Sequence, residues 1–297
     1  MASVDGLRAG WDDDAVDTER FRDEVRVLFE ADGSAPKDRR FRAVMDDVPG
    51  MASENKLAML NLAASLLPPG EAYLEVGSWK GLSTISAMLG NATPAFYALE
   101  KFRECGSRDE VLPDLLANLE RWGVRDRLKL VQRDAFRALT RPDWLGHPVG
   151  VYFYDGDHGR LAHYLALGLA EPLLADEALV IVDDTSWPVV ARATDRYVDS
   201  HPGYDLLYSF EGQIEFDPRW WNGVRVYAFR RDRSALAQPS PAVARRRPFD
   251  LAWRRILHLY AYEPATWVLF RAMRSRPLAA TLRRVLPLKG RRVTPAS

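Results

Sequence analysis

The stretch Y-L-E-V-G-S-W-K-G-L-S-T, from Tyr73 to Thr84, decides the fold class of this chain. A short apolar run contains the acid Glu75, and Gly77 follows the run directly. Gly81 then opens a segment with helical spacing of its apolar residues. A strand, a glycine loop and a helix in this order favour an α/β fold that binds a ligand at the carboxyl end of the strand.

The spacing of the two glycines excludes two kinds of nucleotide loop. A phosphate-binding loop needs a lysine after its second glycine, and Leu82 stands there. A dinucleotide-binding loop needs glycines where Trp79 and Leu82 stand. The remaining pattern, E-x-G-x-x-x-G, lets the backbone approach a ligand and lets the amides of the following helix receive an anion such as a carboxylate. We expect Glu75 to accept a hydrogen bond from an ammonium group, a water or a backbone amide.

Strand and helix patterns alternate after this loop. The predicted strands are residues 72–76, 95–100, 128–132, 149–154 and 178–182, and the predicted helices are residues 81–89, 110–122, 160–174 and 187–200. Two further strands, residues 204–210 and 224–230, have no helix between them. The pattern predicts a doubly wound, mostly parallel sheet with helices on both faces, ending in an antiparallel hairpin.

Helical and linker patterns lie on either side of this core. Residues 11–67 have helical spacing that ends at Pro68 and Pro69, so we expect residues 1–67 to form a helical extension acting as a lid or a dimer contact. The main domain is expected at residues 68–232. A Pro- and Ala-rich linker follows at residues 233–248, and a basic amphipathic helical tail at residues 249–297.

Acidic residues end two apolar runs, V-Y-F-Y-D-G-D-H (residues 151–158) and L-V-I-V-D-D-T-S-W (residues 179–187). Parallel strands place their carboxyl ends at one edge of the sheet, so we expect Asp155, Asp183 and Asp184 to converge. Three adjacent carboxylates repel one another and raise each other's pKa unless a cation lies between them. Oxygen ligands without thiolates favour Mg²⁺, with Mn²⁺ or Ca²⁺ as substitutes.

Together these motifs resemble the class I S-adenosylmethionine-dependent methyltransferases, and in particular the metal-dependent O-methyltransferases of natural-product and sugar modification (methyltransferase family 24, macrocin type). The resemblance implies a Rossmann-like, seven-stranded methyltransferase fold over about residues 68–230. It also implies S-adenosylmethionine as cofactor, with Phe136 or Phe102 packed on its adenine. The cofactor-binding residues that it implies are Glu75, Gly77, Ser78, Gly81, Ser83, Glu100, Asp134, Ala135, Phe136 and Asp155.

The resemblance also implies a reaction. Asp155, Asp183 and Asp184 match the metal ligands of the family, and His158 stands where the catechol-type enzymes carry a lysine. The metal lowers the pKa of an acceptor hydroxyl, and His158 or Asp157 removes its proton, with Asp155 as a further catalytic residue. A second interpretation of Asp157 is that it caps the following helix.

Three functions stay open at this point. The first is Mg²⁺-assisted O-methylation of a hydroxylated small molecule or glycan. The second is metal-independent methylation by the same fold, with the acids as proton acceptors. The third is a non-catalytic, cofactor-binding scaffold that its basic tail recruits to a partner. The sequence favours the first, because the loop and the acids occur together in one strand series.

Composition constrains the location and the partners. Cys105 is the single cysteine, the first residues do not resemble a secretory signal, and no apolar stretch reaches about 18 residues, so we expect a cytoplasmic protein. Residues 230–297 hold 16 Lys and Arg against 3 Asp and Glu, although the whole chain is neutral. This tail is either a helix at the surface of a membrane or a segment docked on the acidic body or on a partner subunit. We expect no nucleic-acid partner.

Overall fold

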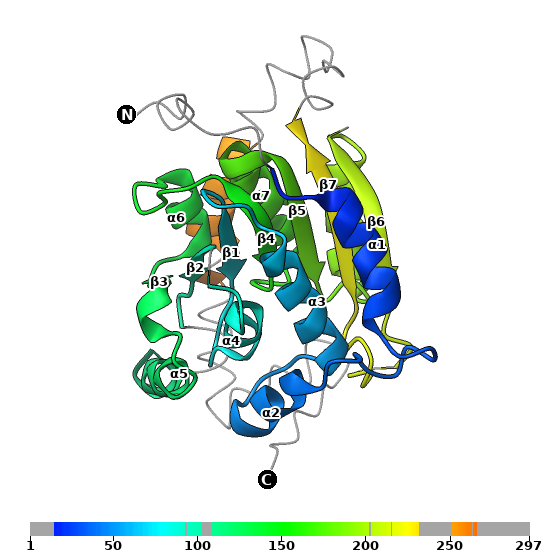
Figure 1. Ribbon diagram of the computed structural model, residues 1–297. Coiled ribbons are helices and arrows are strands. Elements are labelled where there is room, and N and C mark those ends of the chain that lie inside the picture. The colour runs from blue at the N-terminus through cyan, green and yellow to red at the C-terminus, as the bar shows by residue number, and fades with distance from the viewer. Residues whose placement is uncertain are drawn as a thin grey trace, which may run out of the picture. The chain divides into compact units, whose positions relative to one another are not determined.

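A single mixed sheet forms the centre of the protein. The structure is a computed structural model and describes residues 15–92, 94–102, 108–201, 203–214, 216–231, 251–262 and 264–265. Two compact units are present, residues 1–246 and 247–297, and the first contains a sheet with the strand order β3-β2-β1-β4-β5-β7-β6 (Figure 1). The strands are β1 (Ala72–Val76), β2 (Ala95–Leu99), β3 (Leu128–Val131), β4 (Val149–Tyr154), β5 (Leu174–Asp183), β6 (Tyr204–Phe210) and β7 (Val224–Arg230).

The pairing confirms the predicted fold class. Strands β1 to β5 pair in parallel, whereas β7 pairs antiparallel with both β5 and β6. Because the chain order reverses at β1, which lies between β2 and β4, the loops after β1 and β4 open at a topological switch point. Ligands of open α/β sheets bind at this point, so the fold places the glycine loop and the acids after β4 at the expected site.

Helices cover both faces of the sheet. They are α1 (Thr18–Leu28), α2 (Arg40–Asp47), α3 (Glu54–Ser65), α4 (Leu82–Met88), α5 (Arg108–Arg121), α6 (Ala135–Thr140), α7 (Arg160–Ala170) and α8 (Pro188–Val198), with short 3₁₀ turns at Arg125–Arg127 and Glu171–Leu173. Helix α3 contacts α1, α2 and α4, and α7 contacts both α6 and α8. Figure 1 shows α1, α3 and α4 in front of the sheet and α7 behind it.

Successive residues of the central strands are buried on opposite faces of the sheet. Val151, Phe153 and Ile181 belong to a buried cluster with residues of helices α1 to α5. Tyr152 lies between these positions, is fully buried, and donates a hydrogen bond from its hydroxyl to the Ala166 carbonyl of α7 (3.2 Å). Burial on both faces explains why β4 reads as a continuous apolar run and not as an alternating pattern.

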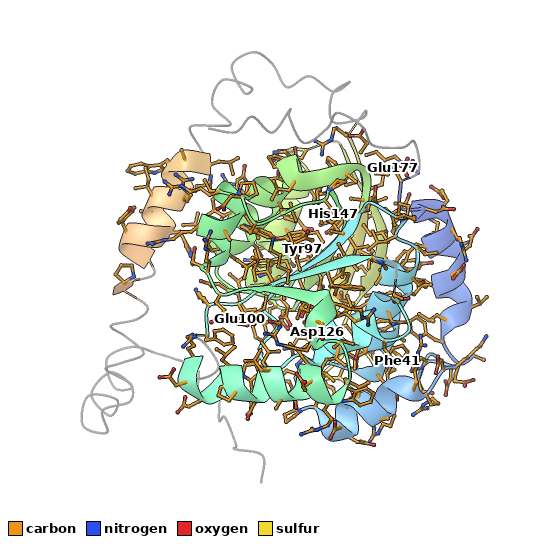
Figure 2. All side chains as sticks on the ribbon, turned by 60° about the vertical axis from the view of Figure 1, so that its left-hand side comes forward. Phe41, Tyr97, Glu100, Asp126, His147 and Glu177 are labelled. Atoms are coloured by element: carbon orange, nitrogen blue, oxygen red, sulfur yellow. The ribbon has the colours of Figure 1, made fainter. Side chains whose placement is uncertain are left out.

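Near the outer part of the sheet, Tyr97 of β2 lies close to His147 (Figure 2). The Tyr97 hydroxyl and His147 Nδ1 are 3.0 Å apart. No sequence motif assigns a function to His147, and this hydrogen bond is consistent with a structural role.

Two predicted boundaries are wrong by four residues each. The helix predicted at residues 160–174 ends at Ala170, and the strand predicted at residues 178–182 begins at Leu174. Pro172 has no backbone N–H to continue the helix, so the chain passes through a short 3₁₀ turn. Leu174 then pairs with Val149 of β4, which starts the strand four residues earlier than its apolar pattern indicates.

The N-terminal helices belong to the same compact unit as the sheet. Within α3, every residue from Glu54 to Ala64 is buried. Ser53 caps this helix by accepting a hydrogen bond from the Lys56 amide (3.3 Å). The segment predicted as an extension is therefore packed into the core, which places its side chains beside the glycine loop.

The tail is described only in part. The predicted linker at residues 233–248 and residues 266–297 lie outside the described residues. Residues 251–257 are helical and are followed by a π-helical turn at His258–Tyr262. Trp253, Ile256, Leu257 and Tyr260 are exposed at helical spacing. These four residues form the apolar side of the predicted amphipathic helix. Contact of this side with a membrane or a partner stays a prediction. No helix in the described parts of the chain has the length and apolar character needed to cross a membrane.

Glu71, just before β1, gives a testable pH dependence of stability. Its side chain is buried, and burial raises its pKa from 4.5 to about 8, with Asp176 and Glu177 adding to the effect. The folded state therefore holds a proton that the unfolded state releases between these two pH values. Stability is full below pH 4.5 and decreases as the pH rises towards 8. We expect Glu71→Gln to remove this dependence.

Urea unfolding at pH 5 and pH 9 measures the effect. Between these pH values the wild type should lose about 2–5 kcal/mol more unfolding free energy than Glu71→Gln. Glu120→Gln, at an exposed helical position, is the matched control and should follow the wild type. Parallel pH profiles of wild type and Glu71→Gln would contradict the prediction.

Candidate active site

The loop between β1 and α4 requires both of its glycines. Gly77 has φ +94°, and a Cβ atom there would lie 2.0 Å from the carbonyl oxygen of Asp155. Gly81 also has φ +94° and stands at the N-terminal cap of α4. The backbone of the glycine loop is thus in direct contact with the backbone that carries the first acid of the second motif.

Glu75 organises this loop from inside. Its carboxylate is fully buried and accepts hydrogen bonds from the hydroxyls of Ser83 (2.7 Å), Thr84 (2.8 Å) and Tyr73 (3.1 Å). Burial raises the pKa of Glu75 to about 7, although the three hydrogen bonds oppose the rise. The sequence predicted an ammonium, water or amide partner, whereas the structure shows hydroxyl partners from β1 and α4. A direct contact of Glu75 or Ser83 with a cofactor stays a prediction.

Glu100 lies at the end of β2 (Figure 2), beside the glycine loop. Its two oxygens accept hydrogen bonds from the amides of Trp79 (2.8 Å) and Phe102 (2.7 Å). Both of these residues have positive φ, 42° and 54°, a region that non-glycine residues seldom adopt. The carboxylate thereby holds two strained loops together. Trp79 contributes to this link through its backbone amide.

Two polar atoms near these loops are buried and have no hydrogen-bond partner among the described residues, Ser78 Oγ and Asp134 Oδ2. The other oxygen of Asp134 caps α6 by accepting from the Arg137 amide (3.0 Å). Ala135 and the buried Phe136 follow in the first turn of that helix. Buried polar groups without partners are costly, and a ligand with donor groups would satisfy them.

A small cavity, about 40 Å³, lies between the loop, the acids and the N-terminal segment. It is lined by Gly50, Met51, Ala52, Lys56, Gly77, Ser78, Trp79, Leu82, Ser83, Phe153, Asp155 and Asp183. This volume admits the end of a ligand and not a whole nucleoside. Gly50 packs so tightly on Leu82 that a Cβ atom would lie 2.2 Å from its side chain. Residues 50–56 therefore cover the glycine loop.

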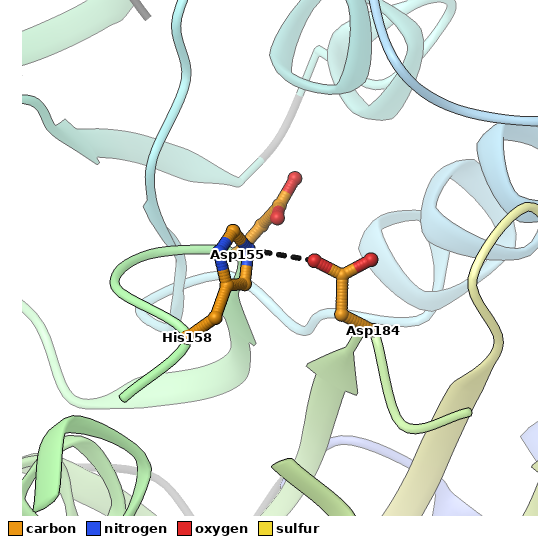
Figure 3. Close-up of side chains that lie close together, drawn as sticks. All are labelled: Asp155, His158 and Asp184. Atoms are coloured by element: carbon orange, nitrogen blue, oxygen red, sulfur yellow. Dashed lines mark ion pairs between the residues drawn. The ribbon is translucent and has the colours of Figure 1, made fainter. Parts of the chain in front are cut away.

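The acids after β4 and β5 converge as predicted, but they divide into two groups. Tyr154 pairs with Val182, which brings the following residues, Asp155 and Asp183, to the same edge. Ligand atoms of Asp155, His158 and Asp184 all lie within 4.8 Å of one another, and Figure 3 shows the three side chains together. His158 Nε2 is 2.6 Å from Asp184 Oδ2.

Asp183 stands apart from this group. Its Oδ1 atom accepts a hydrogen bond from the Asp184 amide (2.8 Å) and forms a buried ion pair with Nζ of Lys56. The sequence placed Asp183 in the metal set with Asp155 and Asp184. In the structure His158 completes the group instead, because the Lys56 ammonium engages Asp183.

The electrostatics of the acids differ accordingly. Burial raises the pKa of Asp155, and the charges of Asp183 and Asp184 raise it further. The pKa of Asp183 is also raised by burial, with Lys56 opposing the rise. Burial opposes ionisation of Asp184 too, but the hydrogen bond and charge of His158 outweigh it and lower the pKa. Asp184 is thus the acid held most firmly as a carboxylate.

Asp157 holds the turn that precedes α7, and no described side chain caps that helix itself. The Oδ1 atom of Asp157 accepts a hydrogen bond from the Gly159 amide (2.7 Å), directly before α7. The cap predicted for Asp157 is therefore wrong, and its catalytic role stays a prediction. His163 on α7 is buried, and burial lowers its pKa to about 3, so it is neutral at physiological pH.

Lys56 is the residue at this site that sequence reasoning missed. It is fully buried on α3, 127 positions from Asp183 in the chain. The only local feature that could have indicated burial of Lys56 is the apolar run L-A-M-L-N-L-A-A that follows it, because the helix formed by this run is buried on all sides. From the sequence alone a lysine at such a position is predicted to face solvent, because lysine is rarely buried without a partner.

The loop between β6 and β7 forms the other side of the acids. Asn222 hydrogen-bonds Asp184 through its side chain and Ser186 through its carbonyl (2.8 Å). Trp220 is buried and stacks on Phe210 with centroids 3.8 Å apart, as expected for a core residue. Trp221 is partly exposed and lies 5.0 Å from the exposed ring of Phe216. This loop therefore presents aromatic surface near the acids.

Comparison with known proteins agrees with this geometry. Residues 74–185 match the family model described as a methyltransferase domain. This segment of the chain therefore resembles a methyltransferase domain. The family recognised from the sequence is thereby confirmed, and the matched segment runs from β1 through the acids after β5. Lys56 lies outside it.

Solved structures support the fold. Cofactor-bound Rv0187 from MTB is 22% identical and has a TM-score of 0.50, covering 74% of this chain and 99% of that chain. The O-methyltransferase from Bacillus cereus, in complex with SAH, is 19% identical with a TM-score of 0.50, covering 66% and 92%. At these identities the likeness shows the methyltransferase fold. No curated protein is significantly similar to this chain.

The contact between Gly77 and Asp155 can be tested by substitution. Alanine at position 77 would clash with a backbone oxygen that cannot rotate away, in addition to the strain of positive φ. Gly70→Ala is the matched control, because Gly70 has φ +95° but nothing within 4 Å of the added atom. We expect Gly77→Ala to lose about 2 kcal/mol more unfolding free energy than Gly70→Ala. Equal losses in denaturant titrations would contradict the close contact.

Proposed function

We propose that this protein is an S-adenosylmethionine-dependent O-methyltransferase that methylates a hydroxyl of a small molecule or glycan. The observation that carries the proposal is the group formed by Asp155, His158 and Asp184 at the sheet edge that also holds the glycine loop. A proton acceptor next to a cofactor loop is the arrangement that transfer of a methyl group to a hydroxyl requires.

Several features support the cofactor. Gly77 and Gly81 allow close approach of a ligand to the backbone. The buried Ser78 hydroxyl can donate a hydrogen bond to a carboxylate of the cofactor, and the buried Asp134 Oδ2 can accept one from an amine. Glu100 stands where doubly wound folds bind ribose hydroxyls. The Bacillus cereus O-methyltransferase of the same fold was solved with SAH. When bound, S-adenosylmethionine supplies the methyl group.

The residues present also fit a divalent cation. Asp155 and Asp184 offer carboxylate oxygens and His158 a ring nitrogen, and the pKa of Asp184 is lowered, which keeps a charged ligand available. Mg²⁺ or Mn²⁺ at this place would lower the pKa of the acceptor hydroxyl. Asp155, Asp184 and His158 would hold it, and Asp183 would stay with Lys56.

An imidazole nitrogen that coordinates a cation cannot take a proton, so His158 is a ligand when the cation is bound, and in its absence we assign His158 as the base of the reaction. Its pairing with Asp184 orients the imidazole and stabilises the protonated form that arises when it takes the acceptor's proton. Trp187 supports the ring from the side, with centroids 4.8 Å apart. The aromatic surface of Phe216 and Trp221 would contact a ring or sugar face of the acceptor.

A second candidate is metal-independent methylation by the same fold. The observation that favours it is the pair of Asp184 and His158, which can act as a base without a metal. The Lys56 ammonium already compensates one of the three carboxylates.

Calorimetry with S-adenosylhomocysteine, with and without Mg²⁺, tests the proposed function. We expect binding in both conditions, because the loop and not the acids contacts the cofactor. Asp155→Asn should bind S-adenosylhomocysteine with nearly unchanged affinity and should lose divalent-cation binding. Failure of the folded protein to bind S-adenosylhomocysteine would refute the enzymatic function. Methyl transfer that is indifferent to a chelator would favour the metal-independent candidate.

Substitution of His158 tests the assigned base. Transfer of a radioactive methyl group to a panel of hydroxylated compounds and glycans gives the rate. We expect His158→Gln to lower it by about 10²–10⁴-fold without weakening S-adenosylhomocysteine binding. Asp157→Asn, which can still accept the hydrogen bond from the Gly159 amide, is the matched control and should stay within a few-fold of the wild type. Similar losses in both variants would argue against His158 as the base.

A further inference from the structure

Lys56 is a buried cation inside the proposed active site. Its side chain is 1% exposed, and that of its ion-pair partner Asp183 is 3% exposed. Lys56 and Asp183 both line the cavity beside Gly77 and Ser78. The lysine comes from α3, outside the segment that matches the methyltransferase family model.

Burial of this pair is expensive for the fold. Moving an ammonium and a carboxylate out of water costs several kcal/mol for each ion, and well-packed apolar residues are often as stable as such a pair. Stability alone therefore gives no reason to place a lysine here. The position of the pair next to the other acids points to a role in the site.

The pair changes which acids can bind a cation. Asp183 Oδ1 receives both the Lys56 ammonium and the Asp184 amide. The charge of Lys56 also acts on Asp155 and Asp184 and favours the ionised form of each, although burial keeps the pKa of Asp155 raised. A positive charge at this place opposes the approach of a second cation and lowers the negative potential that attracts it.

We propose that Lys56 is a positioning residue that serves as a fixed cation for Asp183. It withholds that carboxylate from the metal-binding group of Asp155, His158 and Asp184 and thereby weakens divalent-cation affinity. The inference rests on the metal site of the proposed function. The three carboxylates of the site are Asp155, Asp183 and Asp184. The positive charge of Lys56 and the two charges of one divalent ion together balance their three negative charges.

Mn²⁺ binding to the full-length protein, followed by calorimetry and by the electron paramagnetic resonance of free Mn²⁺, tests this inference. Lys56→Met removes the charge at similar length, and Lys56→Arg retains it as the matched control. We expect Lys56→Met to bind Mn²⁺ at least about tenfold more tightly than the wild type, because a cation is removed and Asp183 is released. Lys56→Arg should bind as the wild type does.

A double-mutant cycle identifies Asp183 as the source of the gain. In Lys56→Met with Asp183→Asn, the gain should be lost, because the freed carboxylate is absent. A lysine that serves only packing would instead give unchanged or weaker Mn²⁺ binding in Lys56→Met. That result, in protein that still binds S-adenosylhomocysteine, would overturn the inference.

Two further outcomes are informative. If Lys56→Met does not fold, Lys56→Gln keeps a hydrogen-bond donor to Asp183 without the charge and should show the same tightening. If neither the wild type nor any folded Lys56 variant binds Mn²⁺, the metal site of the proposed function is wrong and the inference fails with it. Mn²⁺ binding by Lys56→Met but not by the wild type would support the inference in its strongest form.

Discussion

The close approach of Gly77 to the carbonyl of Asp155 is the contact on which the site depends. It joins the loop after β1 to the segment after β4, the two strands that meet where the sheet order reverses. Parallel pairing then aligns Tyr154 with Val182 and brings the acids after β5 to the same edge. A side chain at position 77 would force these backbones apart, so one glycine keeps the loop after β1 and the loop that carries Asp155 within reach of each other.

Around this contact the protein buries an unusual amount of charge. Glu75, Asp183 and Lys56 have almost no exposed surface, and Asp184 has little. Each is tied to a defined partner: hydroxyls for Glu75, an ammonium for Asp183, an imidazole for Asp184. In a low-dielectric environment such pairs are strongly directional, because breaking one would leave a charge without compensation. The carboxylates are consequently held in different electrostatic states although they lie side by side.

The site also extends beyond the methyltransferase domain that the family model covers. Helix α3 supplies Lys56, and residues 50–56 cover the glycine loop. The loop between β6 and β7 supplies Asn222 and the aromatic surface of Phe216 and Trp221. Segments on either side of the matched core therefore line the same edge of the sheet as the acids and the glycine loop.

The sequence by itself determined the parallel sheet with its final hairpin, the ligand loop at Gly77 and Gly81, and the gathering of acids at one sheet edge. These features follow from local periodicity and from the rule that parallel strands share their carboxyl ends. Only the tertiary structure decided the partner of each acid. Asp183 pairs with a lysine 127 positions away, and Asp184 with His158 from the neighbouring strand's loop. No pattern along the chain encodes such pairings, because they depend on how α3 packs over the sheet. The early start of β5 has the same origin, since its pairing with β4 extends it beyond its apolar run.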